Sequence, residues 1–196
     1  MGLRRLGVIM AGSGNQLRII GGRWRSRRLH FPEVEGLRPT PDRVRETLFN
    51  WLAPLIEGAR CLDLFAGSGA LGIEALSRGA SEVVWVERQP LAVRQLRQNL
   101  ARLGEASVQV IQADALVWLG GPSRPFDVVF LDPPFGANLL VPVCVALEQG
   151  GWLADGARIY LESARDAQKL ELPKNWKLAR EKTAGQVSYR LAVRQA

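Results

Sequence analysis

Residues 126–135 read FDVVFLDPPF, an apolar run that ends in a carboxylate, two prolines and an aromatic ring. The segment 128–131 is short, apolar and rich in β-forming residues, which predicts a buried strand. The strand must stop before Pro133, because proline has no backbone N–H to donate to a sheet. Asp132 therefore lies at the carboxyl end of a strand, which in open α/β sheets is the edge where ligands bind. The alternative is a plain strand exit closed by two prolines.

Strands and helices alternate along most of the chain. Strands are expected at 60–65, 82–87, 108–112, 128–131 and 157–162, and helices at 43–55, 73–78, 90–103 and 138–149. This order predicts an α/β, Rossmann-like fold with a doubly wound, mostly parallel sheet. Two further runs, 176–182 and 186–193, predict a C-terminal antiparallel hairpin, so that the mixed sheet has seven strands.

The first helix follows a link that contains two prolines. Either Thr40 or Asp42 can cap it, since both side chains carry an oxygen that accepts from free N–H groups. Its apolar residues recur at helical spacing and are expected to pack on the sheet. Arg43 and Arg45 are expected to face outward or toward the site.

Composition points to one globular domain. The chain has 196 residues, of which 47% are hydrophobic and 23% are charged, as in ordinary soluble proteins. No apolar run approaches the ~18–20 residues of a membrane span, and no convincing signal peptide is present, so we expect a cytoplasmic protein. Cys61 and Cys144 are expected to be buried free thiols. The single histidine, His30, argues against a His-based metal site or a Ser-His-Asp triad, and we expect no metal.

The positive charge is concentrated at the start of the chain. Residues 1–45 contain ten arginines and three acidic residues, so they hold the whole net charge of +7, and the rest of the chain is neutral. A basic arm joined to a neutral body indicates a polyanionic partner. Residues 1–16 are rich in glycine and are expected to form a flexible leader.

Two short alternating runs around Gly21-Gly22 predict a hairpin in this arm. A strand over the following residues would project Arg23, Arg25 and Arg27 on one face beside an exposed Trp24. Arginines next to an aromatic ring suit phosphate pairing and base stacking. The alternative is a solvated, charged hairpin with Trp24 tucked against the body.

A glycine-rich loop follows the first core strand. Gly67, Gly69 and Gly72 have the GxGxxG spacing, and Glu87 ends the next strand 20 residues after Gly67. Glycines let a ligand approach the backbone, and a carboxylate can accept hydrogen bonds from ribose hydroxyls. The pattern satisfies the dinucleotide fingerprint, so a nicotinamide enzyme remains an alternative.

Three features favour S-adenosylmethionine over a nicotinamide cofactor. Asp63, at the strand exit before the loop, can bind the ammonium group of a methionine tail, whereas it would repel a pyrophosphate. Asp114, after the third strand, is placed to accept from an adenine amino group and can also cap a helix. Nothing outside the cofactor half suggests a hydride-transfer site. Taken singly, Asp63 could be a turn carboxylate and Glu87 a solvated strand end.

The residues after the fourth strand suit an exocyclic amine. Such an amine is a poor nucleophile, because its lone pair is delocalised into the base. The Asp132 carboxylate and the Pro133 carbonyl can accept its N–H bonds, Pro134 stiffens the turn, and Phe135 can stack on the base. Methyl transfer is an in-line displacement, so the acceleration should come from positioning and electrostatics.

Two motifs together resemble a class I S-adenosylmethionine-dependent methyltransferase that acts on an amino group: DLFAGSG at 63–69 and DPPF at 132–135. Three further segments resemble the RsmD family, the bacterial small-subunit ribosomal RNA guanine-N2 methyltransferases. These segments are RIIGG at 18–22, RPT at 38–40 and DRVRETLFN at 42–50. The resemblance runs from about residue 17 to the terminal hairpin.

The resemblance implies methyl transfer to N2 of one guanine in small-subunit ribosomal RNA that is already partly assembled with proteins, by a monomeric enzyme. The target base would be flipped or splayed into the site. Alternatives are an N6-adenine methyltransferase acting on DNA or another RNA, and a catalytically idle RNA-binding protein. We expect a leader at 1–16, an RNA-binding arm at 17–38 and a methyltransferase domain at 39–196.

The candidate residues fall into three groups. The catalytic group is Asp132, Pro133, Pro134 and Phe135. The cofactor group is Asp63, Phe65, Ala66, Gly67, Ser68, Gly69, Glu87, Arg88, Asp114 and Ala115. The RNA group is Arg18, Arg23, Trp24, Arg25, Arg27, Arg28, Arg38, Thr40 and Arg43.

Overall fold

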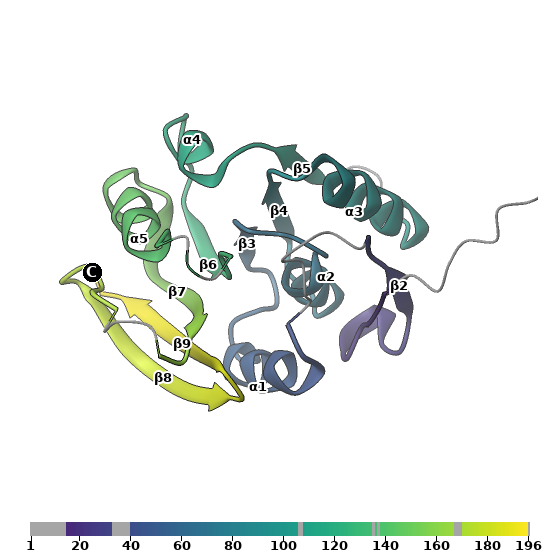
Figure 1. Ribbon diagram of the computed structural model, residues 1–196, viewed down its shortest axis with the longest axis horizontal. Helices are drawn as coiled ribbons and strands as arrows, with labels where there is room; N and C mark the ends of the chain where they lie inside the picture. The colour runs from purple at the N-terminus through teal and green to yellow at the C-terminus, as the bar shows by residue number, and fades with distance from the viewer. Residues whose placement is uncertain are drawn as a thin grey trace, which may run out of the picture.

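One mixed sheet of seven strands, in the order β5-β4-β3-β6-β7-β9-β8, forms the centre of the protein (Figure 1). The structure, a computed structural model, describes residues 15–32, 40–105, 108–134, 136, 138–166 and 170–195. The strands are β3 (Arg60–Asp63), β4 (Glu82–Glu87), β5 (Gln109–Gln112), β6 (Phe126–Leu131), β7 (Leu153–Ala164), β8 (Trp176–Ala184) and β9 (Val187–Arg194). Strands β3 to β7 pair in parallel, and β9 is antiparallel to both β7 and β8. The expected α/β fold with a mostly parallel sheet is confirmed.

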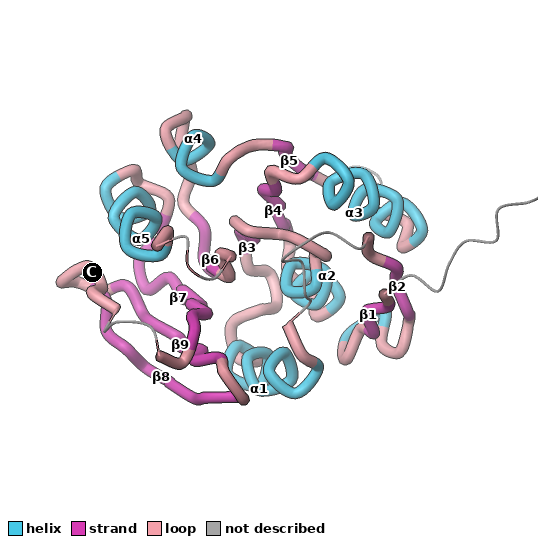
Figure 2. Tube along the Cα trace, viewed as in Figure 1, coloured by secondary structure: helices cyan, strands magenta, loops and turns pink. Residues whose placement is uncertain are grey.

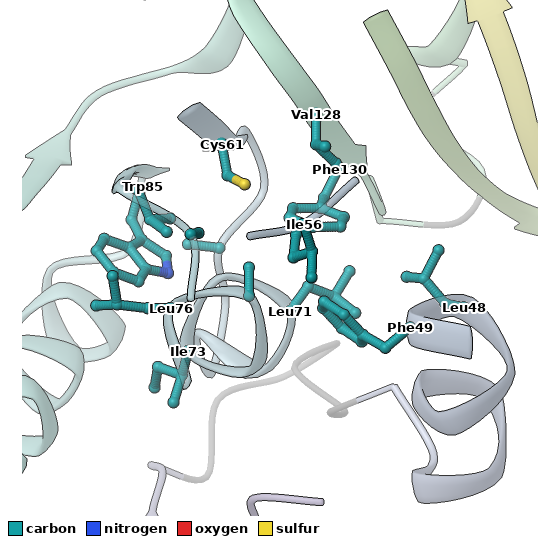
Figure 3. Packing of buried hydrophobic residues seen from close by; sticks show 14 of the residues in the cluster. Leu48, Phe49, Ile56, Cys61, Leu71, Ile73, Leu76, Trp85, Val128 and Phe130 are labelled. Carbon is teal, nitrogen blue, oxygen red and sulfur yellow. The ribbon is translucent and has the colours of Figure 1, made fainter. Parts of the chain in front are cut away.

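Helices cover both faces of this sheet (Figure 2). They are α1 (Asp42–Leu52), α2 (Ala70–Ser77), α3 (Pro90–Arg102), α4 (Ala115–Leu119) and α5 (Leu140–Gln149). Helices α1, α2 and α3 contribute to one buried cluster, in which Phe49, Leu76 and Phe130 lie (Figure 3). Helices α4 and α5 contribute to a second cluster. The site therefore lies on a scaffold that is packed from both sides.

Strand β6 shows why the sequence is apolar without alternation. Successive side chains of a strand point to opposite faces. Val128 and Phe130 lie in the cluster with α1 and α2, whereas Val129 and Leu131 lie in the cluster with α5. A strand covered on both faces has no solvent side, so a continuous apolar run is its normal signature.

Helix α1 starts differently from the expectation. Its N-cap is Pro41, which provides no side-chain cap, and Asp42 is the first helical residue. The Asp42 carboxylate instead binds two guanidinium groups, those of Arg18 and Arg45. The expected outward orientation of Arg45 is wrong, because its side chain has no exposed surface. Arg43 is exposed, as expected.

The basic arm contains the expected hairpin, formed by β1 (Gln16–Arg18) and β2 (Arg28–His30). The strand expected beyond Gly22 is wrong, since η1 (Gly22–Trp24) is a 3-10 turn. Trp24 is 5% exposed and packs in the cluster with α2, so the expected exposed ring is wrong and the alternative of a ring tucked against the body is confirmed. Its indole buries more apolar surface against the body than a bare hairpin can offer. The arm lies beside α2 and α3, across the molecule from the β8–β9 hairpin (Figure 1).

Three other features of the described residues bear on the sequence expectations. Cys61 and Cys144 are both buried and free. No helix in the described ranges is long and apolar enough to cross a membrane. Of the expected leader, residues 1–14 lie outside the described residues.

Candidate active site at the carboxyl edge

The order of the strands reverses between β3 and β6. Chain connections leave this point in opposite directions, which opens a crevice at the carboxyl ends of these two strands. Asp63 is the last residue of β3, and Asp132 follows the last residue of β6. The fold thus places the two carboxylates predicted from strand ends at the usual ligand crevice of such sheets.

The glycine loop turns sharply between β3 and α2. Gly67 and Gly69 have φ angles of 51° and 78°, in the left-handed region where a side chain is disfavoured. A Cβ atom at Gly69 would also come within 2.3 Å of the Leu96 side chain. Gly69 is the N-cap of α2, so the first free N–H groups of this helix lie next to the loop.

Asp63 lies beneath this loop and is only 3% exposed. The N–H group of Gly72 donates to its Oδ2 atom over 3.0 Å. Burial raises the pKa of Asp63 to about 7, against the lowering effect of that hydrogen bond and with a further increase from Glu87. A buried carboxylate with one neutral donor is well suited to a cationic group of a ligand.

Glu87 closes the other side of the loop from the end of β4. Its Oε2 atom accepts from the N–H group of Gly67 over 2.8 Å, and its Oε1 atom accepts from that of Gln89 over 2.7 Å. Each carboxylate oxygen has a second lone pair, so both remain able to accept from ribose hydroxyls. The structure brings Glu87 and the loop together as the sequence predicted.

Asp114 is the N-cap of α4, after the end of β5. Its Oδ1 atom accepts from the N–H groups of Leu116 and Val117. Oδ2 receives no hydrogen bond from any described residue, and the side chain is exposed. The expected helix cap is confirmed, and an acceptor remains free on this side of the crevice.

The remaining cofactor candidates differ in how far their side chains are exposed. Ala66, Ser68 and Ala115 are buried, Phe65 is half-buried, and Arg88 is exposed beside Glu87 in the chain. Buried small residues here leave room for a ligand close to the backbone.

Asp132 is half-buried. It lies on the β6 side of the switch point, the place between β3 and β6 where the strand order reverses. The Thr40 hydroxyl lies 3.5 Å from its Oδ2 atom, at the outer limit of a hydrogen bond. Burial raises the pKa of Asp132 well above its usual value, and the charges of Glu162 and Asp63 raise it further. Pro133 is buried and Pro134 exposed, whereas Phe135 lies outside the described residues.

Thr40 was expected on an RNA-binding surface, but it is 5% exposed and contacts Asp132.

The arm arginines divide into two sets. Arg18 pairs with Asp42, and Arg23 pairs with Glu105 and stacks over Trp24. The set without an acidic partner among the described residues is Arg25, Arg27, Arg28 and Arg43, all of them exposed. Arg38 lies outside the described residues.

A cavity of about 210 Å³ separates the arm from the start of α1. Arg18 and Arg25 line it from the arm, and Asp42 and Glu46 line it from the helix. Thr40, two residues before Asp42, contacts Asp132, so the start of α1 connects the lining of this cavity to the surroundings of Asp132.

Sequence reasoning missed the residues that attach the arm. Glu74, in α2, accepts from the N–H groups of Ile20 and Gly21 and pairs with the Arg45 and Arg78 side chains. One charged residue in an otherwise apolar helix, ALGIEALS, was the available signal. Such a residue is expected to have a buried partner, although the sequence does not say which.

These features define a class: a Rossmann-like methyltransferase, with a glycine loop and acids at its strand ends. A family model described as "Conserved hypothetical protein 95" matches residues 17–193. An Escherichia coli (strain K12) protein named ribosomal RNA small subunit methyltransferase D is 53% identical over 186 residues, which cover 95% of this chain and 93% of that protein. The protein of the same name from Haemophilus influenzae is 50% identical over 180 residues, covering 90% and 93%.

A solved structure from Escherichia coli superposes with a TM-score of 0.87 at 50% identity, covering 92% of this chain and 99% of that one. The chain therefore belongs to the Conserved hypothetical protein 95 family, and the resemblance to the RsmD proteins is confirmed.

Proposed function

We propose that this protein transfers a methyl group from S-adenosylmethionine to the exocyclic N2 amine of one guanine in small-subunit ribosomal RNA. The observation that carries the proposal is the position of Asp132, which faces the glycine loop across the switch point of the sheet. The names of the similar proteins support the ribosomal RNA substrate.

The chemistry of the crevice fits S-adenosylmethionine. Asp63 is buried without a cationic partner among the described residues, so it suits the ammonium group of the methionine portion. Glu87 offers acceptors to the ribose, Oδ2 of Asp114 offers one to the adenine amino group, and the loop glycines leave the backbone open to approach. When bound, this cofactor supplies a methyl group on a positively charged sulfur.

Asp132 and the Pro133 carbonyl would hold the amine. A hydrogen bond from N–H to the carboxylate orients the amine and favours the geometry in which its lone pair points at the methyl carbon. The negative charge also stabilises the positive charge that develops on nitrogen. The rigid turn of two prolines keeps these acceptors in place, and Phe135 would stack on the base.

The arm would bind the RNA. Arg25, Arg27, Arg28 and Arg43 are exposed and carry no acidic partner in the described part of the chain. Guanidinium groups bind phosphates with paired hydrogen bonds, so such a surface attracts the RNA backbone. Residues 17–38 would thus be the RNA-binding arm, and residues 39–196 the catalytic domain.

We propose a partly assembled small subunit as the partner, which places the protein in the cytoplasm. A monomer is favoured because the edge strand β8 exposes Lys177, Arg180 and Lys182. Charged side chains on a sheet edge oppose pairing with another edge.

The test is transfer of a tritiated methyl group to small-subunit particles, to naked ribosomal RNA and to DNA. Asp132→Ala should abolish transfer and leave cofactor binding, measured by calorimetry, within about threefold of the original. The control is Asp155→Ala, which removes an exposed carboxylate near the start of β7, at the end of the sheet away from Asp132. Equal transfer to DNA, or a fully active Asp132→Ala variant, would overturn the proposal.

A further inference from the structure

Glu162, in β7, is a buried acid that the proposed function does not use. Its side chain is 4% exposed, although an ionised carboxylate is costly to bury without a partner. The hydroxyl of Tyr160 donates to its Oε2 atom over 2.7 Å. No guanidinium or ammonium group of the described residues lies within 4.0 Å of it. The residue therefore needs an explanation other than an ion pair.

The strand register places Glu162 beside Asp132. Leu131 of β6 pairs with Leu161 of β7 in the parallel ladder, so the next residue of each chain lies opposite the other. Both side chains follow the alternation onto the same face of the sheet, the one on which Phe130 and Tyr160 are buried. Asp63 lies on this face as well, two residues after Cys61 of the same cluster.

The surroundings of this pair contain little positive charge. The ionisable groups on its face of the sheet are Tyr160 on its own strand, Tyr189 on β9, Asp63 on β3 and, one strand further out, the exposed Lys182 of β8. Helix α1 covers this face with Trp51, which stacks on Tyr189. The Arg45 guanidinium donates to the carbonyl of Thr40, whose hydroxyl contacts Asp132, and is held by Asp42 and Glu74. The Arg190 guanidinium donates to the Ser163 hydroxyl and pairs with Glu181. No group of three or more His, Cys, Asp or Glu residues in the described part could hold a metal ion.

We infer that Glu162 is a positioning residue for methyl transfer: fixed by Tyr160 and set opposite Asp132 by the strand register, it holds a negative charge beside Asp132, so that Asp132 takes the proton released by the guanine amine. The inference rests on the proposed function. Two like charges on adjacent strands in a buried place disfavour each other, so a proton on one of them is favoured. Burial raises the pKa of both carboxyl groups, and the charge of Glu162 raises the pKa of Asp132 further, whereas the hydrogen bond from Tyr160 opposes the rise at Glu162.

The N2 lone pair forms the bond to the methyl carbon, while the electron pair of the broken carbon–sulfur bond stays on sulfur. The nitrogen then carries an extra bond and a positive charge, and one of its two protons moves to the Asp132 carboxylate. Asp132 returns this proton to water after the methylated base leaves.

Glu162→Gln is the decisive variant, because glutamine keeps the shape and can still accept from Tyr160. With the neighbouring charge removed, the acidic limb of the kcat–pH profile should move to lower pH by about one unit. The plateau kcat should fall about tenfold, since Asp132 becomes a weaker base, whereas KM for the RNA stays unchanged. Tyr160→Phe removes the hydrogen bond that favours the ionised form of Glu162, so Glu162 is protonated more readily. The acidic limb should then also move to lower pH, but by less than in Glu162→Gln.

A second measurement does not depend on activity. The carbon-13 signal of the Asp132 carboxyl group, followed against pH in the free protein, should titrate at lower pH in Glu162→Gln. Glu148→Gln, at the far end of α5, is the control and should leave both readouts unchanged. If Glu162→Gln does not fold, Tyr160→Phe decides the question.

An unchanged pH profile and an unchanged carboxyl titration in the folded variant would overturn the inference. The proposed function fails separately, if the unaltered protein transfers no methyl group to ribosomal RNA.

Discussion

Arg45 and Glu74 form a fully buried ion pair, in which Arg45 Nη1 lies 3.4 Å from Glu74 Oε2 and neither side chain has exposed surface. The pair joins α1 to α2. The same carboxylate accepts from the N–H groups of Ile20 and Gly21 over 2.9 and 2.8 Å. Arg45 in turn donates to the carbonyl of Arg18. Two buried charges thus attach the arm to α1 and α2 and fix its orientation.

Glu74→Ala should therefore loosen the arm and destabilise the protein. It leaves the buried Arg45 with Asp42 as its one remaining carboxylate and removes the acceptor of the Ile20 and Gly21 N–H groups, which together costs about 3–5 kcal/mol of unfolding free energy. Limited proteolysis within residues 15–32 should become faster. Glu105→Ala is the matched control, since Glu105 pairs with Arg23 of the same arm at the surface, where such pairs contribute about 0–1 kcal/mol. Similar destabilisation of both variants would contradict the assigned role of the buried pair.

Gly72→Ala should destabilise the loop and weaken cofactor binding. A Cβ atom at this position would lie 2.1 Å from Nε1 of the buried Trp85, and the N–H group of Gly72 holds Asp63. Overpacking of this kind costs about 1–3 kcal/mol. Thermal unfolding and calorimetry with S-adenosylmethionine would measure the two effects. Gly120→Ala is the control, because its Cβ would meet its nearest neighbour at 3.3 Å; equal behaviour of the two variants would count against the tight contact.

Stability of the cofactor-free protein should carry a pH signature from Asp63. Burial raises the pKa of Asp63 to about 7 in the folded state, above the ordinary value of 3.8. The folded state thus binds the proton more tightly, so this contribution is complete below pH ~4 and is lost as the pH rises through about 7. Asp63→Asn removes the effect.

The variant should gain stability relative to the original protein between pH 4 and pH 8, by up to about 4 kcal/mol. Urea unfolding at a series of pH values measures this difference. A difference that stays constant across the range would show that Asp63 does not titrate in this way.

Arg25→Ala or Arg27→Ala should weaken RNA binding and flatten its salt dependence. Removing one arginine–phosphate interaction reduces the slope of log K against log salt by about one counterion or slightly less. Filter binding at several salt concentrations provides the slope. Lys177→Ala, at the start of the edge strand β8, is the control for removal of a surface charge. A slope equal to that of the original protein would argue that the arm does not touch phosphate.

Local sequence was sufficient for the secondary elements that surround the site. The two prolines end β6 at Leu131, and the spacing of Gly67, Gly69 and Gly72 turns the chain into α2. These effects act over a few neighbouring residues, so they can be derived without knowing the partners of each segment. The place of Asp63 and Asp132 at one sheet edge followed from the alternation of strands and helices.

The arm shows where local patterns fail. Arg45 was expected to face outward or toward the site, and Trp24 to be exposed, with a ring tucked against the body as the alternative. Both side chains are buried. Their positions depend on Ser77 and Glu74, which lie more than 25 residues away in the chain and become neighbours only when α2 packs on the sheet. A charged residue is normally solvated, so its sequence gives no sign of a partner that the fold supplies.

Four features can be derived from the sequence alone: the order of the elements, the glycine loop, the acids at the strand ends and the basic arm. Each follows from backbone sterics, hydrophobic periodicity or net charge, which are local or additive. Only the tertiary structure decided which polar groups meet: Glu74 with Arg45, Thr40 with Asp132, and Glu162 opposite Asp132. The first two pairs form because burial removes water as the competing partner, whereas strand register brings the two acids together, and both burial and register are properties of the packed chain as a whole.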